Sequence, residues 1–252
     1  MKLDNIKKLH QKKHRVEFGC FLVEGEHLIL ELAKAAKINP LLASAKIYTS
    51  ESYSSALSDN LMVNNSLSEF ETQTISDKQM QKISDTKSPQ GILAVVPLNA
   101  TIGPQEQIHQ QRTVYLHEVQ DPGNLGTILR TLAWFGDFSC VLSPNSVDPF
   151  NPKVVRASMG AIFHVPIEID VSIDTLKTRF DQFACLDIDG EPLSTPSFSN
   201  HKCFIFGNEA RGVPRESLSD LNLQSFSIQG NGVLESLNLA TAVNMCAYEL
   251  NR

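Results

Sequence analysis

The sequence predicts an α/β protein whose C-terminal half is an open, mostly parallel sheet with helices on both faces. Short apolar segments alternate with amphipathic segments from residue 113 to residue 250, which is the pattern of strands alternating with helices. Residues 113–142 have a strand–helix–strand pattern, and such a unit implies that its two strands pair in parallel. The 252 residues, 42% of them hydrophobic, suffice for one large domain or two modest ones.

The elements of the C-terminal half follow from apolar runs and turn residues. We expect a strand at Thr113–Val119, then a helix that is capped by Asn124 and ends at Gly136. The last helix is expected at Glu235–Leu250, because apolar residues recur there at helical spacing. The other predicted strands are Ser139–Leu142, Phe163–Ile169, Phe183–Ile188, Cys203–Gly207 and Gln224–Ile228.

The N-terminal half predicts a smaller α/β domain. Apolar runs predict strands at Phe21–Val23, Ala45–Thr49 and Gly91–Val96, and residues 26–37 have the apolar spacing of a helix. Residues 51–90 are polar and serine-rich, with weak helical stretches. A Pro- and Gln-rich stretch without periodicity then predicts a linker. The predicted organisation is a first domain at 1–98, a linker at 99–111 and a second domain at 112–252.

Composition excludes several classes of protein. The longest apolar runs fall far short of the roughly 18 residues that a membrane helix needs, and the basic N-terminus lacks the apolar stretch of a secretory signal. Five cysteines without a CxxC pair predict buried thiols in a reducing compartment, not a disulfide framework or a zinc site. We therefore expect a soluble, cytoplasmic protein with no membrane partner and no bound metal.

Charge is distributed unevenly along the chain. The formal net charge is −6, yet residues 1–16 carry six basic residues against Asp4 alone. A local basic surface can neutralise RNA phosphates without a positive charge on the whole protein. This segment is either an RNA-binding surface or a solvated or disordered run. The residues predicted to bind RNA here are Lys7, Lys8, Lys12, Lys13 and Arg15.

Three segments that follow predicted strands carry the polar residues of a candidate site, since ligands of open α/β sheets bind beyond the carboxyl ends of the strands. The first is Asp-Pro-Gly-Asn-Leu-Gly-Thr-Ile-Leu-Arg at residues 121–130. Arg130 lies off the apolar stripe and can point back toward the loop. Spacing alone favours a plainer interpretation, in which Asn124 caps a helix, glycine turns the chain and Arg130 lies on a solvated face.

The second segment, Phe206–Pro214, places Glu209 between two glycines. Gly207 and Gly212 have the spacing of a phosphate-binding loop, but Val-Pro follows where that loop needs Lys-Ser or Lys-Thr. A nucleoside triphosphatase is therefore excluded. Glu209 could be a helix-start carboxylate and nothing more. Its two glycines and Arg211 instead favour a small molecule bound in close contact with the backbone.

The third segment, Ile228–Asn238, contains a glycine loop and then the polar residues Ser236 and Asn238 at the predicted start of the last helix. Ser236 could simply cap that helix. Each of the three segments is weak by itself. Their occurrence in this order and at this spacing is not expected by chance.

These residues resemble the SpoU–TrmH family of RNA ribose 2′-O-methyltransferases. The family motif Asn-x-Gly-x-x-x-Arg is matched by residues 124–130, Gly-x-Glu-x-x-Gly by residues 207–212, and Ser-Leu-Asn by residues 236–238. The loop at 147–161 is also similar to the corresponding loop of the family. The resemblance covers essentially all of residues 113–252.

The resemblance implies a deep trefoil knot in the C-terminal part, and S-adenosylmethionine as the cofactor. Residues 7–25 and 89–96 are similar to the N-terminal domain of the family, which resembles a ribosomal RNA-binding protein fold. The chain has Gln229-Gly230 where family members often have Pro-Met. The residues implied in cofactor binding are Gly207, Ile228, Gly232 and Leu237.

The resemblance also implies the catalytic residues, which are Arg130, Asn124, Glu209, Ser236 and Asn238. Arginine is a poor candidate for a base because its pKa exceeds about 12. We expect Arg130 to orient the ribose hydroxyl and the adjacent phosphate and to stabilise the developing alkoxide. Asn124 and Asn238 would position the ribose and Arg130, and Glu209 and Ser236 would complete the polar network. The family completes this site across a homodimer, so a homodimer is expected.

The expected substrate is ribosomal RNA in preference to transfer RNA, and the further RNA contacts expected near Arg130 are Lys153, Arg156 and Arg211. One alternative is a transfer RNA 2′-O-methyltransferase. Another is a catalytically inactive RNA- or ribosome-binding protein of the same fold, for which Gln229-Gly230 is the only support. A nucleotide-dependent enzyme on a doubly wound sheet ranks third, because it lacks its glycine motifs.

Overall fold

The computed structural model describes residues 1–57, 61–102 and 111–252. The chain divides into two compact units. The N-terminal unit is Met1–Thr101 with Asp148–His164, and the C-terminal unit is Ile102–Val147 with Val165–Arg252. The domains predicted from the sequence are 1–98 and 112–252. Most of the predicted linker at 99–111 lies outside the described residues.

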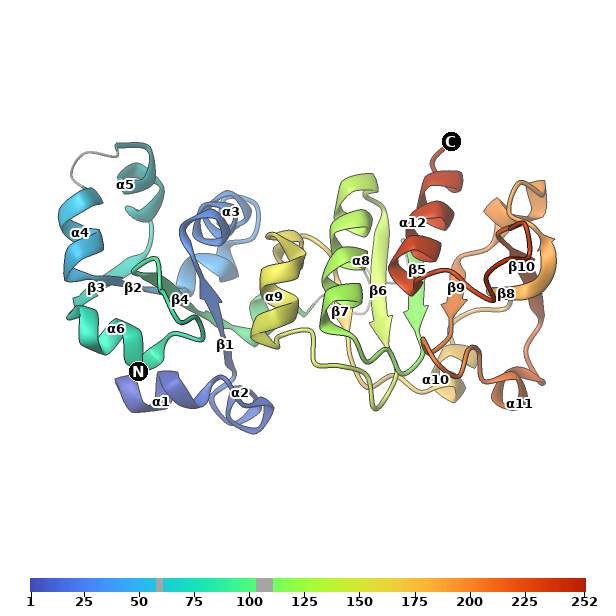
Figure 1. The fold of residues 1–252 in the computed structure, drawn as a ribbon, viewed down its shortest axis with the longest axis horizontal. Coiled ribbons are helices and arrows are strands. Elements are labelled where there is room, and N and C mark those ends of the chain that lie inside the picture. Colours follow the sequence, from blue (N-terminus) through green and yellow to red (C-terminus); the bar gives the residue numbers. More distant parts are fainter. Residues whose placement is uncertain (58–60, 103–110) are drawn as a thin grey trace. The chain divides into compact units, whose positions relative to one another are not determined.

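The N-terminal unit contains a four-stranded sheet of β1 (Cys20–Glu24), β2 (Lys46–Ser50), β3 (Glu71–Ile75) and β4 (Ile92–Pro97). Their order is β1-β4-β2-β3, with β2 and β3 parallel and β4 antiparallel to both of its neighbours (Figure 1). Strand β3 was not predicted, because four of its five residues are exposed and polar. The α-helices of this unit are α1 (Leu3–Lys8), α2 (Lys12–Phe18), α3 (Glu26–Ala36), α4 (Glu51–Leu57), α5 (Leu61–Leu67), α6 (Asp77–Ile83) and α9 (Pro152–Ser158).

The basic N-terminal segment is helical and anchored by apolar side chains. Ile6 and Leu9 are fully buried in a cluster that also includes Tyr48, Met80 and Leu93. Burying two large aliphatic side chains contributes on the order of 1.5–3 kcal/mol each relative to leaving them exposed. The lysines of the same segment are exposed, so α1 and α2 present a basic outer surface over an apolar inner one.

The C-terminal unit contains a six-stranded sheet in which every pair of neighbouring strands is parallel. This confirms the predicted α/β fold with a mostly parallel sheet. Proceeding across the sheet, the strands are β10 (Leu223–Ser227), β8 (Phe183–Pro192), β9 (Cys203–Phe206), β5 (Arg112–Leu116), β6 (Phe138–Leu142) and β7 (Ile167–Glu168).

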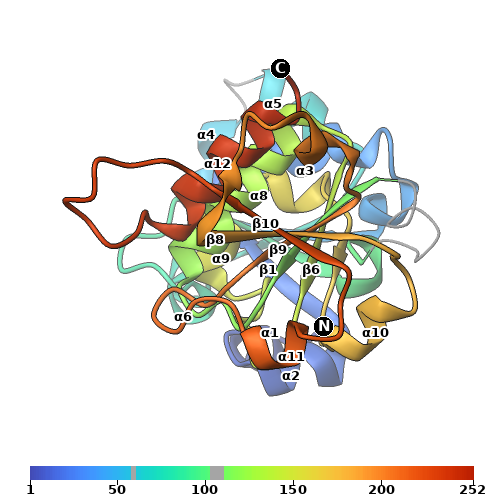
Figure 2. The same ribbon diagram turned by 90° about the vertical axis from the view of Figure 1, so that its right-hand side faces the viewer.

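Helices cover both faces of this sheet. Figure 2 shows α8 (Pro122–Phe135) and α12 (Leu239–Glu249) side by side on one face, with α10 (Ile173–Lys177) and α11 (Arg215–Leu218) on the other. Side chains alternate between the two faces of a strand. Those facing α10 and α11 form a core cluster that includes Tyr115, Val141, Phe183 and Ile205. Because both faces are covered, the central strands are apolar throughout, as parallel strands usually are.

Several predicted elements differ in their bounds from those observed. The strand expected at Phe163–Ile169 is wrong in its first half, since residues 161–163 form a 3-10 helix and only Ile167–Glu168 pairs in the sheet. The strand expected at Thr113–Val119 is β5, which ends at Leu116. It stops before Glu118, whose φ of 50° is incompatible with extended backbone. The last helix begins at Leu239 and not at Glu235, because Asn238 caps it.

The helices of the described ranges are short. The longest α-helix, α8, has 14 residues, and none of the described helices is long and apolar enough to cross a membrane.

The five cysteines are unpaired. Burial was expected for all five and is observed for four, whereas Cys20 is only partly buried. Burial raises the pKa of the Cys140 thiol to about 12. Burial also raises the pKa of the Cys185 thiol to about 12, with the nearby Asp187 carboxylate acting in the same direction. These side chains therefore pack as small apolar residues.

Candidate active site

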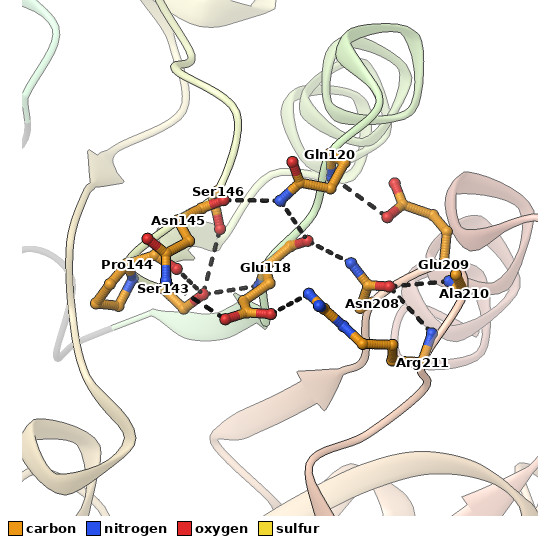
Figure 3. Close-up of polar contacts among 10 residues, drawn as sticks. All are labelled: Glu118, Gln120, Ser143, Pro144, Asn145, Ser146, Asn208, Glu209, Ala210 and Arg211. Atoms are coloured by element: carbon orange, nitrogen blue, oxygen red, sulfur yellow. Dashed lines mark hydrogen bonds and ion pairs between the residues drawn. The ribbon is translucent and has the colours of Figure 1, made fainter.

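Polar side chains gather where three neighbouring strands of the C-terminal unit end. The loops that follow β9, β5 and β6 leave the same edge of the parallel sheet, because the strands are adjacent and parallel. Figure 3 shows side chains of the three loops in contact, with Glu118 between the loop after β6 and the loop after β9. This is the edge at which open α/β sheets bind their ligands.

Helix α8 begins one turn earlier than the sequence analysis predicted. Its N-cap is Asp121, whose Oδ1 accepts a hydrogen bond of 2.7 Å from the backbone N–H of Asn124. Pro122 occupies the first turn, where a missing N–H costs nothing. The predicted cap, Asn124, therefore lies inside the first turn, and its side chain is free for a different contact.

Glu209 contacts the side chain of Asn124. Its Oε1 accepts hydrogen bonds from Asn124 Nδ2 at 3.2 Å and from the Asp121 N–H at 3.3 Å, and its Oε2 accepts one from the Gln120 N–H at 3.3 Å. The carboxylate thus lies at the N-terminus of α8, where backbone N–H groups and the helix dipole favour negative charge. Glu209 joins the loop after β9 to the start of α8.

Asn124 also joins α8 to α12. Asn238 Nδ2 donates a 2.8 Å hydrogen bond to Asn124 Oδ1. Asn238 Oδ1 in turn accepts hydrogen bonds from the N–H groups of Ala240 at 2.9 Å and Thr241 at 3.3 Å, which caps α12. A carboxylate only accepts hydrogen bonds and a backbone N–H only donates them. The two ends of this chain therefore fix which way both amides point.

The loop at residues 207–212 is closed by its own backbone. Asn208 and Gly212 exchange two backbone hydrogen bonds, of 2.9 and 2.8 Å. A Cβ on Gly207 would lie 2.2 Å from the backbone carbon of Gly212, so only glycine fits there. Gly212 itself has a φ of +67°, which also favours glycine. Both glycines of the Gly-x-Glu-x-x-Gly motif therefore serve the turn that presents Glu209.

A buried asparagine joins this loop to the loop that follows β5. Asn208 is 7% exposed, its Nδ2 donates a 2.7 Å hydrogen bond to the Glu118 carbonyl, and its Oδ1 accepts from the N–H groups of Ala210 and Arg211. The Arg211 guanidinium pairs with the Glu118 carboxylate. Burial lowers the pKa of the adjacent His117, which therefore favours its neutral form.

Arg130 and Ser236 stand apart from this network. Arg130 lies on an exposed face of α8, and no hydrogen bond or ion pair joins it to the described residues of the chain. Ser236 is exposed in the segment before α12 and likewise has no side-chain bond to the described residues. Of the five predicted catalytic residues, the structure thus brings Asn124, Glu209 and Asn238 together.

A pocket of about 510 Å³ lies beside α12 at the ends of β8 and β10. Thr241, which contacts Asn238, lines it, so the pocket and the polar network share the first turn of α12. Of the four residues predicted to bind a cofactor, Ile228 lines the pocket. Gly207 lies in the loop after β9, and Gly232 and Leu237 are exposed in the segment before α12. The other lining residues are Pro192, Leu193, Ser194, Ser227, Gln229, Asn244, Met245, Tyr248 and Glu249.

The predicted RNA-binding residues divide into exposed and paired groups. Lys7, Lys8, Lys12 and Lys13 are exposed on or beside α1 and α2. Arg15 was predicted to bind RNA, but it is 3% exposed and its guanidinium is occupied. Its Nε donates to Asp148 at 3.0 Å and its Nη1 to the Leu9 carbonyl at 2.8 Å. We therefore remove Arg15 from the predicted RNA surface.

The basic residues of α9 belong to the N-terminal unit, not to the unit that contains Arg130. Arg156 Nη1 forms an ion pair with Asp85 Oδ2 at 2.9 Å, and Lys153 occupies the first turn of α9. The third predicted residue, Arg211, is 68% exposed along its side chain but is paired with Glu118. In the described ranges no group of three or more His, Cys, Asp or Glu side chains is arranged to hold a metal ion.

Four residues of the site escaped the sequence analysis: Glu118, Gln120, Asp121 and Asn208. Asp121 could have been found, since an aspartate directly before a proline is a common helix start. The other three act through contacts between loops that lie far apart in the sequence, and no local pattern in the sequence marks such contacts.

Comparison with known proteins agrees with these motifs. The model of the SpoU rRNA Methylase family matches residues 111–248, and the model of the MRM3-like substrate binding domain matches residues 1–94. The chain is 32% identical over 257 residues to the 23S rRNA (guanosine(2553)-2′-O)-methyltransferase RlmP of Bacillus subtilis, covering 99% of this chain and 95% of the relative.

Solved structures share the fold over nearly the whole chain. An AdoMet-bound rRNA methyltransferase from Sinorhizobium meliloti is 26% identical with a TM-score of 0.78, covering 98% of this chain and 93% of that one. The SpoU methyltransferase AviRb from Streptomyces viridochromogenes, in complex with AdoMet, has a TM-score of 0.78 at 20% identity, covering 98% of this chain and 96% of that one. The chain therefore belongs to the SpoU rRNA methylase family.

Proposed function

We propose that this protein transfers a methyl group from S-adenosylmethionine to a ribose 2′-hydroxyl of RNA, with ribosomal RNA as the substrate. The observation that carries the proposal is the hydrogen-bonded chain from Glu209 through Asn124 to Asn238 at the carboxyl edge of the sheet. It joins residues from all three motifs by which the chain resembles the family. Relatives that are named as ribosomal RNA methyltransferases support the substrate class.

The pocket beside α12 fits the cofactor. Its volume of about 510 Å³ lies within the range of roughly 300–1,000 Å³ that small-molecule sites occupy. Leu193 and Ile228 offer apolar surface, and Ser194, Ser227 and Gln229 offer hydrogen-bonding groups. When bound, S-adenosylmethionine supplies an electrophilic sulfonium methyl group. The related rRNA methyltransferase from Sinorhizobium meliloti, which is 26% identical, binds AdoMet and supports this assignment.

The side chains of this protein then have to hold the ribose and stabilise charge on its oxygen. An arginine side chain donates hydrogen bonds and accepts none, so Arg130 orients the 2′-hydroxyl and the neighbouring phosphate and stabilises the developing alkoxide. The fixed amides of Asn124 and Asn238 position the ribose. Glu209 holds Asn124, and Ser236 joins the polar network once the substrate is present.

We infer that two copies of the chain complete the site. Arg130 has no partner among the described residues of its own chain, which suits a residue that acts at the site of a second copy. Large apolar side chains are exposed on the two adjacent helices: Trp134 on α8 is 85% exposed and Tyr248 on α12 is 59% exposed. Exposed aromatic residues on neighbouring helices are typical of an interface.

We assign RNA binding to the exposed lysines of α1 and α2, because the apolar anchors beneath these helices hold the lysines at the surface. The trefoil knot, the ribosomal-protein-like fold of the N-terminal unit, the domain bounds 1–98 and 112–252 and a cytoplasmic location are further parts of the proposal. They rest on the family resemblance and on composition.

The test is transfer of a tritiated methyl group from S-adenosylmethionine to protein-free ribosomal RNA and, separately, to transfer RNA. Label in ribosomal RNA alone is expected. Label in transfer RNA alone would overturn the substrate assignment, and no label in either would contradict the activity. Calorimetry with S-adenosylmethionine separates an inactive RNA-binding protein, which would bind RNA without binding the cofactor.

A further inference from the structure

Glu118 has a backbone conformation that is strained for a residue other than glycine. It lies two residues past β5 with a φ of 50°, in the left-handed region that non-glycine residues seldom adopt. Strain of this kind persists only where surrounding contacts hold the residue in place. The contacts of Glu118 therefore indicate its role in the structure.

All the hydrogen-bonding groups of Glu118 are used, and they reach two other loops (Figure 3). Its N–H donates a 2.7 Å hydrogen bond to Ser143 Oγ in the loop after β6. Its carbonyl accepts from Asn208 Nδ2 at 2.7 Å and from Gln120 Nε2 at 3.1 Å. Its carboxylate pairs with Arg211 and lies 3.5 Å from Asn145 Nδ2.

Two of the residues that contact Glu118 lie on either side of Glu209 in the sequence. Asn208 is bound to the Glu118 carbonyl, and Arg211 is bound to its carboxylate. Glu209, which stands between them in the chain, directs its own carboxylate at Asn124 and the N-terminus of α8. Holding the loop at both points fixes where the Glu209 carboxylate lies.

We propose that Glu118 is a positioning residue, which holds the 207–212 loop so that Glu209 fixes the amides of Asn124 and Asn238 for methyl transfer. The inference rests on the proposed function for its kinetic consequence, but its structural consequence can be measured without any RNA. Glu118 acts through Asn208 and Arg211. It does not line the pocket beside α12.

The Glu118→Gly variant separates the side chain from the backbone. Glycine adopts a φ of 50° without strain and keeps both the carbonyl and the N–H, so the variant removes the carboxylate contacts alone. Asp137→Gly is the matched control, because Asp137 also has a positive φ (56°) and is exposed at the amino end of β6. Glu118→Gln keeps a hydrogen-bond acceptor for Arg211 without the charge.

In the free protein, Glu118→Gly is expected to speed amide exchange across residues 208–212 at least tenfold, with Glu118→Gln intermediate and Asp137→Gly unchanged. In the transfer assay its kcat is expected to fall about 10- to 100-fold, as when a catalytic group is displaced slightly. The KM for RNA and the affinity for S-adenosylmethionine should stay within about threefold.

Unchanged exchange, or faster exchange with an unchanged kcat, would overturn the positioning role. A fall in kcat with a matching loss of cofactor affinity would also overturn it, because the loop would then serve the pocket. If the wild-type protein methylates no RNA, the proposed function fails, while the exchange measurement still decides whether Glu118 holds the loop. Should Glu118→Gly fail to fold, Glu118→Gln provides the same comparison.

Discussion

Asn238 donates a 2.8 Å hydrogen bond to Asn124 across 114 positions of sequence. The bond joins the first turn of α8 to the cap of α12, and its direction is set by Glu209 at one end and by backbone N–H groups at the other. Two motifs far apart in the chain thus form one rigid polar unit.

Asn124→Asp should abolish most activity while leaving the fold intact. The change replaces a donor to Glu209 by a second carboxylate at the same distance, and like charges this close repel. Because Asn238 then also loses its ordered partner, kcat is expected to fall by about 100-fold or more. The control Asn222→Asp, at an exposed asparagine just before β10, should keep full activity. Equal kcat values for both variants would refute the role of Asn124.

Asp121→Ala should destabilise the C-terminal unit. Asp121 is the N-cap of α8, and losing such a cap costs about 1 kcal/mol of unfolding free energy. The free energy from urea denaturation measures the effect, with Asp181→Ala, at an exposed aspartate, as the comparison. If both variants were equally stable, the cap assignment would be wrong.

Arg15→Met should destabilise the protein without weakening its attraction to RNA. Removing one partner of a buried ion pair leaves Asp148 unpaired and costs about 3–5 kcal/mol. Adding Asp148→Leu should recover part of that loss, because the remaining unpaired charge is removed as well. A stable Arg15→Met protein with weaker RNA binding would restore the RNA-contact role that the sequence suggested.

Changing both Lys12 and Lys13 to Gln should have the opposite effect. Both side chains are exposed, so stability should change little. Each phosphate contact contributes roughly 0.7–0.9 to the slope of log affinity against log salt, so the slope should fall by about 1.5. Fluorescence anisotropy with labelled RNA at several salt concentrations gives the slope. An unchanged slope would place the RNA elsewhere.

The cysteines should be almost unreactive in the native protein. Burial raises the pKa of Cys140 and Cys185 to about 12, and it raises the pKa values of Cys203 and Cys246 further. A raised thiol pKa leaves little of the reactive thiolate at pH 8. In the native protein, Ellman's reagent should therefore label no thiol other than Cys20 within minutes. In denaturant it should label all five thiols. Rapid labelling of several native thiols would contradict the packing of the sheet.

Much of the C-terminal unit could be predicted from sequence, because its buried parallel strands are apolar runs and its site residues sit in compact motifs. The N-terminal unit could be predicted less well, since β3 is polar on its exposed faces. The burial of Arg15 depends on Asp148, 133 positions away, and no local pattern shows such a partner. Asn124 was assigned as a cap because its residue type suits that role, but Asp121 occupies the cap and leaves Asn124 for the site.

The most direct test of the proposed activity is to identify the methylated product. Ribosomal RNA treated with the protein and S-adenosylmethionine is digested to nucleosides and analysed by mass spectrometry, with Arg130→Ala as the inactive comparison. We expect a 2′-O-methylated nucleoside at one position, absent with Arg130→Ala although that variant still binds the cofactor. A methyl group on a base, or undiminished 2′-O-methylation by Arg130→Ala, would contradict the proposed activity.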